Sequence, residues 1–550
     1  MRRIIVPVFP NTNLILHNFE IMPPEIFQKY LYVLFILQDK YIGLLILFIF
    51  NQLILQRGVV LGVYTKEGDS DDPKLTPTAE KFDDRLHGKL MELIREYNIT
   101  GRLGKGKIFS NIDPEFRAVA VVGVGKDGLG YNELELIDEG MENVRVAAGI
   151  GAKKLQEQGC TEIYVESFEF AEQAAEGSAL AVYIYQDNKR KQDKLPLPKL
   201  DLYDSPDMEA WTRGLFKAEA QNLARRLTDT PANQMTPTAF AQATMDCLCP
   251  CGVTVEVRTM DWIEQNNLNS FLIIARGSCE PPIMLEISYC GASVDEKPIL
   301  LVGKGITFNS GGICLKKKYG MDEYRGAMAG AAVCVASVRA AAALSLPINV
   351  TAIIPLCENM PSGMACKPGD VVTCLNGKTV CIQDTDRAGI LVMADPLLYG
   401  QNVHKPKLVV DVATLGQGVR KGLGGGAAGI FSSSNFIWKQ FQKAGAITGD
   451  RLWRMPLWNY YKKKVRDYLH CDLSNKGHGP ASSCLAAACL HEFVPCADWA
   501  HIDIRGVGML SKYGGVPYLL PQRMTGRPTR TLIQFLYQMA CPEEQSKELK

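Results

Sequence analysis

The chain contains 550 residues, of which 47% are hydrophobic and 22% are charged. This composition excludes a disordered tail, a collagen-like repeat and a small disulfide-stapled module, and the length predicts two to four domains. The 60 Lys and Arg residues nearly balance the 59 Asp and Glu residues, so the net charge does not indicate a nucleic-acid partner. The 17 cysteines cannot all pair because their number is odd, which favours reduced thiols of an intracellular protein.

Residues 1–57 differ in composition from the rest of the chain and form an atypical hydrophobic extension. Their two apolar runs, 30–37 and 41–50, are separated by Asp39 and Lys40. A membrane-spanning helix needs about 20 continuous apolar residues, and Asp39 and Lys40 interrupt this run near its middle. Three interpretations stay open: a membrane anchor, a buried or interfacial helix, and a stretch wrongly joined to the chain by conceptual translation. We expect no membrane partner unless residues 30–55 form a true anchor.

Residues 58–207 have the pattern of a first α/β domain that ends in a linker. Short apolar runs at 118–122, 162–165 and 181–185 predict strands, and residues 142–155 predict a helix. The following stretch, 186–207, is polar and contains three prolines, which is typical of a linker or a long excursion of the chain.

Strands and helices alternate through residues 208–541, which we predict to form a second α/β domain before a polar tail at 542–550. The predicted helices and strands are helix 216–227, strand 299–302, helix 328–346, strand 348–356 and strand 408–412. Such alternation predicts a mixed, mostly parallel sheet flanked by helices. Ligands bind such sheets beyond the carboxyl ends of the strands, so we expect the chemistry in the loops after Val302, Leu356 and Val412.

Three short motifs have ordinary explanations. Residues 123–128 match a dinucleotide-binding spacing, but no helix opens within the glycines, so a glycine-rich turn is favoured. The cysteines at 247, 249 and 251 lack a second Cys or His pair at zinc-finger spacing, which indicates thiols in a turn after a helix. We interpret His501 as a structural histidine on a strand.

The run from Leu301 to Lys316 is more informative. A buried strand ends there in a glycine-rich loop that carries Lys304 and Lys316, with Asn309 between them. Taken alone, the loop could bind phosphate, because lysines and backbone amides attract anions.

The same loop, with further ordered motifs, resembles the leucyl aminopeptidases of the M17 metallopeptidase family. These motifs lie at residues 222–237, 358–370, 411–415, 453–456 and 524–532. The resemblance implies an N-terminal macro-like α/β domain, a C-terminal catalytic domain, assembly as a hexamer and a cytoplasmic location. It also implies two divalent cations, zinc, manganese or magnesium, that share a bridging water and remove the N-terminal residue of a peptide.

The metal-ligand positions implied by the family are partly replaced in this sequence. Lys304 and Asp386 match two of the five ligands. Asn309, Ala327 and Ala388 stand where the other three, all carboxylates, are expected.

Two further family positions bear on catalysis. Lys316 matches the lysine that stabilises the oxyanion, whereas Ile390 replaces the arginine that holds a bicarbonate. Asp384 is an additional carboxylate, and Arg387 is predicted to form an ion pair with Asp384 or Asp386.

These replacements predict that the two cations are lost or weakly bound, because one carboxylate cannot balance their +4 charge. The first hypothesis is an inactive homologue with a structural or binding role. It resembles most the insect sperm members with degenerate metal sites, and a mitochondrial location is expected in place of the cytoplasmic one only if the protein is of that sperm type. The alternatives are an active manganese- or zinc-dependent aminopeptidase that acts on peptides and a protein tethered to a membrane through residues 1–57.

Overall fold

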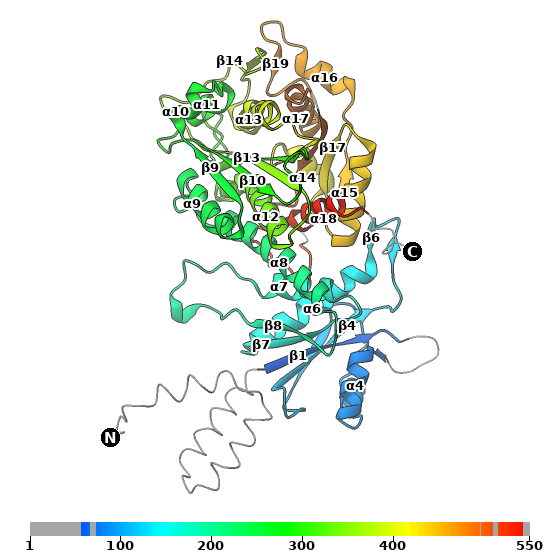
Figure 1. Ribbon diagram of the computed structural model, residues 1–550. Helices are drawn as coiled ribbons and strands as arrows, with labels where there is room; N and C mark the ends of the chain where they lie inside the picture. Colours follow the sequence, from blue (N-terminus) through cyan, green and yellow to red (C-terminus); the bar gives the residue numbers. More distant parts are fainter. Residues whose placement is uncertain (1–56, 67–72, 496, 510–514, 543–550) are drawn as a thin grey trace, which may run out of the picture.

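The computed structural model describes residues 57–66, 73–495, 497–509 and 515–542. The predicted extension before residue 57, its candidate anchor at 30–55 and the tail beyond residue 542 lie outside these ranges. The described chain forms two α/β halves, one coloured blue to cyan and one green to red, that pack against each other through helices (Figure 1). The predicted class, two α/β domains, is therefore confirmed.

The first half contains a six-stranded sheet between two layers of helices. Its elements are β1 (Arg57–Tyr64), β2 (Lys74–Leu75), α4 (Pro77–Arg85), α5 (Lys89–Glu96), β3 (Gly106–Ser110), β4 (Ala118–Gly125), the hairpin β5 (Tyr131–Asn132) and β6 (Ile137–Asp138), α6 (Glu139–Glu157), β7 (Glu162–Glu166), α7 (Ala171–Val182), the 3-10 turn η1 (Lys191–Asp193) and β8 (Lys199–Tyr203). The strand order is β3-β4-β1-β7-β8, with β2 added to β1, and the pairs β4–β1, β1–β7 and β7–β8 are parallel. Helices α6 and α7 cover one face, and α4 and α5 cover the other.

The second half begins with a long helix and contains the larger sheet. Its helices are α8 (Met208–Asp229), α9 (Pro237–Leu248), α10 (Met260–Gln265), α11 (Asn269–Ala275), α12 (Ala329–Ala343), α13 (Ala388–His404), α14 (Gln417–Leu423), α15 (Asn435–Thr448), α16 (Asn459–Arg466), α17 (Ser482–Leu490) and α18 (Thr529–Ala540), with 3-10 turns η2 (Cys249–Cys251), η3 (Met321–Met328), η4 (Thr385–Arg387) and η5 (His491–Phe493). Its strands are β9 (Thr254–Arg258), β10 (Ile283–Cys290), β11 (Ile299–Gly303), β12 (Gly305–Asn309), β13 (Asn349–Asn359), β16 (Leu408–Ala413), β17 (Ala428–Ser432), β18 (Leu452–Arg454) and β20 (Asp498–Asp503), with a separate small sheet of β14 (Val371–Thr373), β15 (Thr379–Cys381) and β19 (Leu473–Ser474).

The larger sheet is mixed and parallel at its centre, as predicted. Its order is β18-β17-β20-β16-β11-β13-β10-β9, with β12 added to β13, and the four central strands β20, β16, β11 and β13 run parallel. Helices α9, α12, α15 and α18 pack on one face, whereas α11, α13 and α17 pack on the other. Because the central strands are covered on both faces, their residues form almost continuous apolar runs.

Two sequence predictions in the first half are wrong. Residues 181–185 do not form a strand, because the buried, alanine-rich helix α7 continues to Val182. The stretch 186–207 is more than a linker, since β8 within it forms the edge of the first sheet and pairs with β7. A short apolar run can belong to a buried helix as well as to a strand, which explains the first error.

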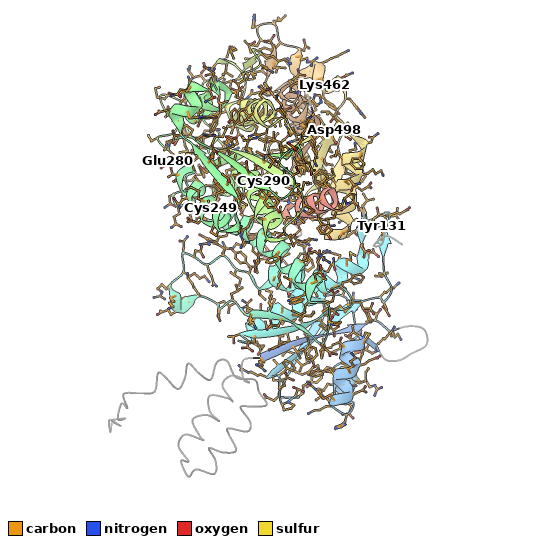
Figure 2. All side chains as sticks on the ribbon, in the orientation of Figure 1. Tyr131, Cys249, Glu280, Cys290, Lys462 and Asp498 are labelled. Atoms are coloured by element: carbon orange, nitrogen blue, oxygen red, sulfur yellow. The ribbon has the colours of Figure 1, made fainter. Side chains whose placement is uncertain are left out.

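The three short motifs have the ordinary structures expected of them. Residues 123–128 end β4 and turn, and α6 begins only at Glu139. The three clustered thiols lie at the end of α9 and in η2, and no cysteine among the described residues forms a disulfide bond. Figure 2 shows Cys249 and Cys290, both exposed, on the C-terminal half of the molecule. His501 is a buried residue of β20 whose Nδ1 lies 2.5 Å from Oδ1 of Asp411 on β16.

The helical stretch Met321–Ala343 is long and apolar enough to cross a membrane by length and composition. Most of its apolar window is buried inside the protein, where α12 packs on the larger sheet. The core helix of a water-soluble domain meets the same criteria, so this stretch is not evidence of a membrane span.

The two halves meet at a cluster of buried ionic side chains. Glu176 of α7 accepts hydrogen bonds from Arg145 of α6 at 2.5 Å and from Arg530 of α18 at 2.6 Å. Arg145 also bonds Glu142, and Arg530 bonds the hydroxyl of Tyr518 at 3.1 Å. Burial opposes ionisation, but the charges of Arg145 and Arg530 outweigh it and lower the pKa of Glu176 to about 2.

Candidate functional site

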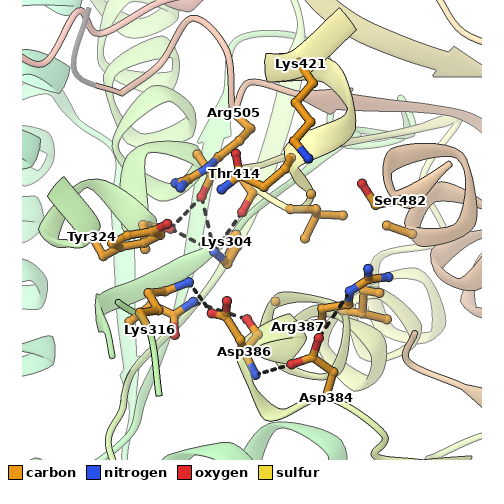
Figure 3. A pocket seen from close by; sticks show the side chains of 18 of the residues that line it. Lys304, Lys316, Tyr324, Asp384, Asp386, Arg387, Thr414, Lys421, Ser482 and Arg505 are labelled. Atoms are coloured by element: carbon orange, nitrogen blue, oxygen red, sulfur yellow. Dashed lines mark hydrogen bonds and ion pairs between the residues drawn. The ribbon is translucent and has the colours of Figure 1, made fainter. Parts of the chain in front are cut away.

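A cavity of about 330 Å³ opens where the central strands of the larger sheet end. Lys304 directly follows β11 and Thr414 directly follows β16, and both line the cavity. They lie in two of the loops in which the sequence predicted the functional residues. Lys316, Asp386 and Arg387 line it as well (Figure 3). The cavity therefore collects side chains that are far apart in the sequence.

Lys304 lies at the bottom of the cavity and is 2% exposed. Its Nζ donates to the carbonyl oxygens of Thr414 at 3.0 Å and Ala327 at 3.2 Å, and lies 3.2 Å from the hydroxyl of Thr414. A Cβ at Gly389 would lie 2.6 Å from Cε of this lysine, so only glycine leaves room for it there. Burial and then the positive charges of Arg505 and Lys316 lower the pKa of Lys304 to about 7.

Asn309 is buried, and its amide is used to hold the loops together. Its Oδ1 accepts hydrogen bonds from the backbone amide of Gly311 at 2.9 Å and from Nδ2 of Asn359 at 2.8 Å. Its Nδ2 donates to the carbonyl oxygen of Asp386 at 3.4 Å. Both Oδ1 and Nδ2 of Asn309 therefore form hydrogen bonds with neighbouring protein groups.

Two ion pairs lie along one wall of the cavity. Lys316 pairs with Asp386, and Nε of Arg387 lies 3.5 Å from Oδ2 of Asp384. Oδ1 of Asp384 accepts the backbone amide of Asp386 at 3.0 Å, and Arg387 also donates to the carbonyl oxygen of Lys476 at 3.0 Å. The predicted ion pair of Arg387 is confirmed, and its partner is Asp384.

The three remaining family positions carry only buried apolar side chains. Ala327 contributes its carbonyl oxygen, which accepts from Lys304 and from the hydroxyl of Thr414. Ala388 and Ile390 lie in the first turn of α13, 0% and 3% exposed. No group of three or more His, Cys, Asp or Glu side chains that could hold a metal ion occurs among the described residues. The side chains present do not fit a two-metal centre.

Arg505 is a cavity residue that sequence reasoning missed. It follows β20, is 4% exposed, and stacks on the ring of Tyr324 with its guanidinium carbon 4.6 Å from the ring centre. Its Nη1 contacts the sulfur of Met509, whereas its Nη2 is buried without a hydrogen-bond partner. Burial lowers the pKa of Arg505. Its position just beyond a central strand is the signal that could have identified it.

Positive charges outnumber negative ones around the cavity. Apart from Lys304, the cavity is lined by the cations Lys316, Arg387, Lys421 and Arg505 and by the carboxylates Asp384 and Asp386. In Figure 3, Lys421 and Arg505 reach in from one side and the two ion pairs lie on the other. Two further carboxylates, Glu323 and Asp503, lie near Arg505 but do not line the cavity. Such a field opposes the entry of divalent cations.

Comparison with known proteins identifies the family. Residues 222–533 match the catalytic domain of the cytosol aminopeptidase family, and residues 60–192 match its N-terminal domain. The chain belongs to this family, M17. The cytosol aminopeptidase of Bos taurus is 44% identical over 88% of this chain and 93% of its own length, and that of Homo sapiens is 44% identical over 88% and 92%.

Solved structures share the fold of this M17 chain. The bottromycin maturation enzyme BotP in complex with Mn superposes with a TM-score of 0.75 and 28% identity, covering 88% of this chain and all of the other. A mutant of tomato leucine aminopeptidase superposes with a TM-score of 0.73 and 22% identity, covering 88% of this chain and 94% of its own. M17 proteins are generally oligomeric, and the curated relatives are named cytosol aminopeptidases.

Proposed function

We propose that this protein is a catalytically inactive M17 homologue that has kept the aminopeptidase fold and serves a structural or binding role. One observation carries the proposal. Of the positions where the family resemblance implies five metal ligands, only Asp386 offers a carboxylate, and it is paired with Lys316.

Three charged side chains of the cavity oppose the binding of two metal ions. Asp386 would have to give up its ion pair with Lys316 before it could bind a cation. A lysine binds a metal through its deprotonated amine, but Nζ of Lys304 is already directed at carbonyl oxygens. Arg505 adds a buried positive charge. Two hard dications need several anionic oxygen ligands to replace their hydration shells, and this cavity does not supply them.

The test is metal content together with turnover. We expect the purified full-length protein to contain far less than one equivalent of zinc or manganese per subunit by inductively coupled plasma mass spectrometry. We also expect no measurable hydrolysis of leucine amide after incubation with either metal, and a melting temperature that a chelator does not change. Two tightly bound equivalents, or turnover that the chelator abolishes, would overturn the proposal.

The alternative, an active manganese- or zinc-dependent aminopeptidase, is supported by the family and by the retained Lys304, Lys316 and Asp386. It predicts the opposite result in the same two measurements. A Lys316→Met variant sharpens the distinction, because an active enzyme would lose its turnover, whereas an inactive homologue has none to lose.

The finer assignments follow from the family resemblance. We propose that the protein assembles as a hexamer and is cytoplasmic, or mitochondrial if its role is that of the sperm-type members. Light scattering of the purified protein tests the assembly, and fractionation of the endogenous protein tests the location.

A further inference from the structure

The cavity described above has the features of an anion-binding site. Among its lining side chains, two of the four cations beside Lys304 are paired with carboxylates: Lys316 with Asp386, and Arg387 with Asp384. Lys421 lines the cavity, is exposed to solvent and makes no ion pair with a described residue. The cavity therefore presents surplus positive charge.

The side chain of Arg505 gives a second, independent indication of an anion-binding site. Its guanidinium is buried, yet Nη2 meets no acceptor among the described residues. Leaving a charged N–H group buried and unpaired is costly, and proteins tolerate it mainly where a ligand completes the bonding. Tyr324 holds the guanidinium by stacking on it, so the free N–H group has a defined position.

Two helices also begin at the cavity. Gly389 and Ile390, in the first turn of α13, line it, as does Ser482, the first residue of α17. No side chain caps the N-terminus of α17, whereas α13 continues from the turn η4, whose N-terminus is capped by the side chain of Asp384. The positive end of the α17 dipole thus adds to the field, and the hydroxyl of Ser482 offers a further donor.

We propose that the cavity binds a small oxyanion, a carboxylate or phosphate group, between Arg505 and Lys421. The guanidinium donates a charge-assisted hydrogen bond to one oxygen, and the ammonium group of the exposed Lys421 contacts the anion from the solvent side. The volume of about 330 Å³ suits a small organic acid or a phosphorylated metabolite. Ile390, Leu415 and Ala486 line the same cavity and provide apolar contacts for such a ligand. The inference rests on the proposed absence of the metal pair.

Calorimetric titration of the full-length, chelator-treated protein tests the site, with inorganic phosphate and succinate as separate probes. We expect at least one probe to bind with one site per subunit. The Arg505→Leu variant should weaken binding by about tenfold or more, because a hydrogen bond to a charged group is lost. Lys421→Gln should weaken it by about threefold, and Lys463→Gln, an exposed lysine on α16, should leave it unchanged.

The two probes distinguish the source of the oxyanion. Binding of phosphate alone indicates a phosphorylated ligand, and binding of succinate alone indicates a carboxylate. Equal binding of both indicates a site that reads only the charge. Absence of binding to both probes, or equal affinities of the parent and both cavity variants, overturns the inference.

A failure here is distinguishable from a failure of the proposed function. If the protein as purified contains metal and binds phosphate only with that metal present, the proposed function fails. If it is free of metal and binds neither probe, the proposed function stands and the anion site alone is refuted. Lys421 is exposed, so its variant stays informative even if the buried Arg505→Leu substitution impairs folding.

Discussion

Two groups of buried charges in this protein differ in how they are compensated. At the junction of the two halves, Glu176 receives hydrogen bonds from Arg145 and Arg530, so opposite charges neutralise each other directly. In the cavity, Arg505 is equally buried but has an unpartnered Nη2 and lies near Lys304, a second cation.

The difference distinguishes buried charges that stabilise the fold from buried charges that can bind a ligand. Removing charges from water is unfavourable, and in a compensated cluster the interactions among all members together offset this cost. Losing one member leaves the others uncompensated. A buried cation with an unused hydrogen-bond donor, such as Arg505, instead lowers the stability of the empty protein and creates affinity for an anion. The comparison predicts that charge removal has opposite effects on stability in the two places.

The largest expected effect is at the junction of the halves. The Glu176→Gln variant should lose about 3 to 5 kcal/mol of unfolding free energy, because buried Arg530 would lose its carboxylate partner and buried Arg145 would keep only Glu142. Denaturant unfolding measures the loss. Glu157→Gln, on an exposed position of α6, is the matched control and should change the stability little. A loss no greater than that of the control would contradict the structural role of the cluster.

Glu166 extends the comparison to a buried acid with no cation beside it. Its Oε2 accepts from the hydroxyl of Thr76 at 3.0 Å, its Oε1 has no partner, and burial raises its pKa from 4.5 to about 8. The folded state thus keeps the carboxyl protonated while the unfolded state ionises. The stability contribution of this group is complete below pH 4.5 and falls by up to about 1.4 kcal/mol per pH unit until pH 8.

Replacing this acid should remove that pH dependence. Glu166→Gln cannot ionise, so it should equal the parent protein near pH 4.5 and exceed it in stability at pH 8. Urea unfolding at several pH values measures the two slopes. Parallel curves for parent and variant would show that Glu166 does not titrate in this range.

The smallest expected effect is at the cavity, and it has the opposite sign from that of Glu176. Arg505→Leu should raise the unfolding free energy by about 1 kcal/mol, because an unsatisfied buried donor is removed. The melting temperature in anion-free buffer, with Lys463→Gln as the control, measures the gain. Destabilisation in that buffer would mean that the stacking of Arg505 on Tyr324 contributes more than its missing hydrogen bond costs.

Local patterns in the sequence were sufficient to predict many of the strands and helices and part of the candidate site. Long buried strands such as β11 and β16, and the alanine-rich α12, follow from apolar runs whose ends are marked by Gly, Pro or polar residues. The pairing of Arg387 with Asp384 was predictable because the two side chains are three residues apart. The resemblance to the family motifs was also sufficient to predict that Asn309, Ala327 and Ala388 occupy ligand positions without a carboxylate.

Only the tertiary structure decided how the remaining charges are arranged. Lys316 and Asp386 meet because two loops converge at the ends of parallel strands, which no local pattern reveals. Arg505 enters the same cavity from beyond β20, so its missing acceptor becomes apparent only after folding. The sequence by itself determined the family and the residues that stand at its predicted ligand positions, because both lie in contiguous motifs. The surplus positive charge of the cavity depends on which distant side chains come together in the fold. The sequence motifs do not contain that information.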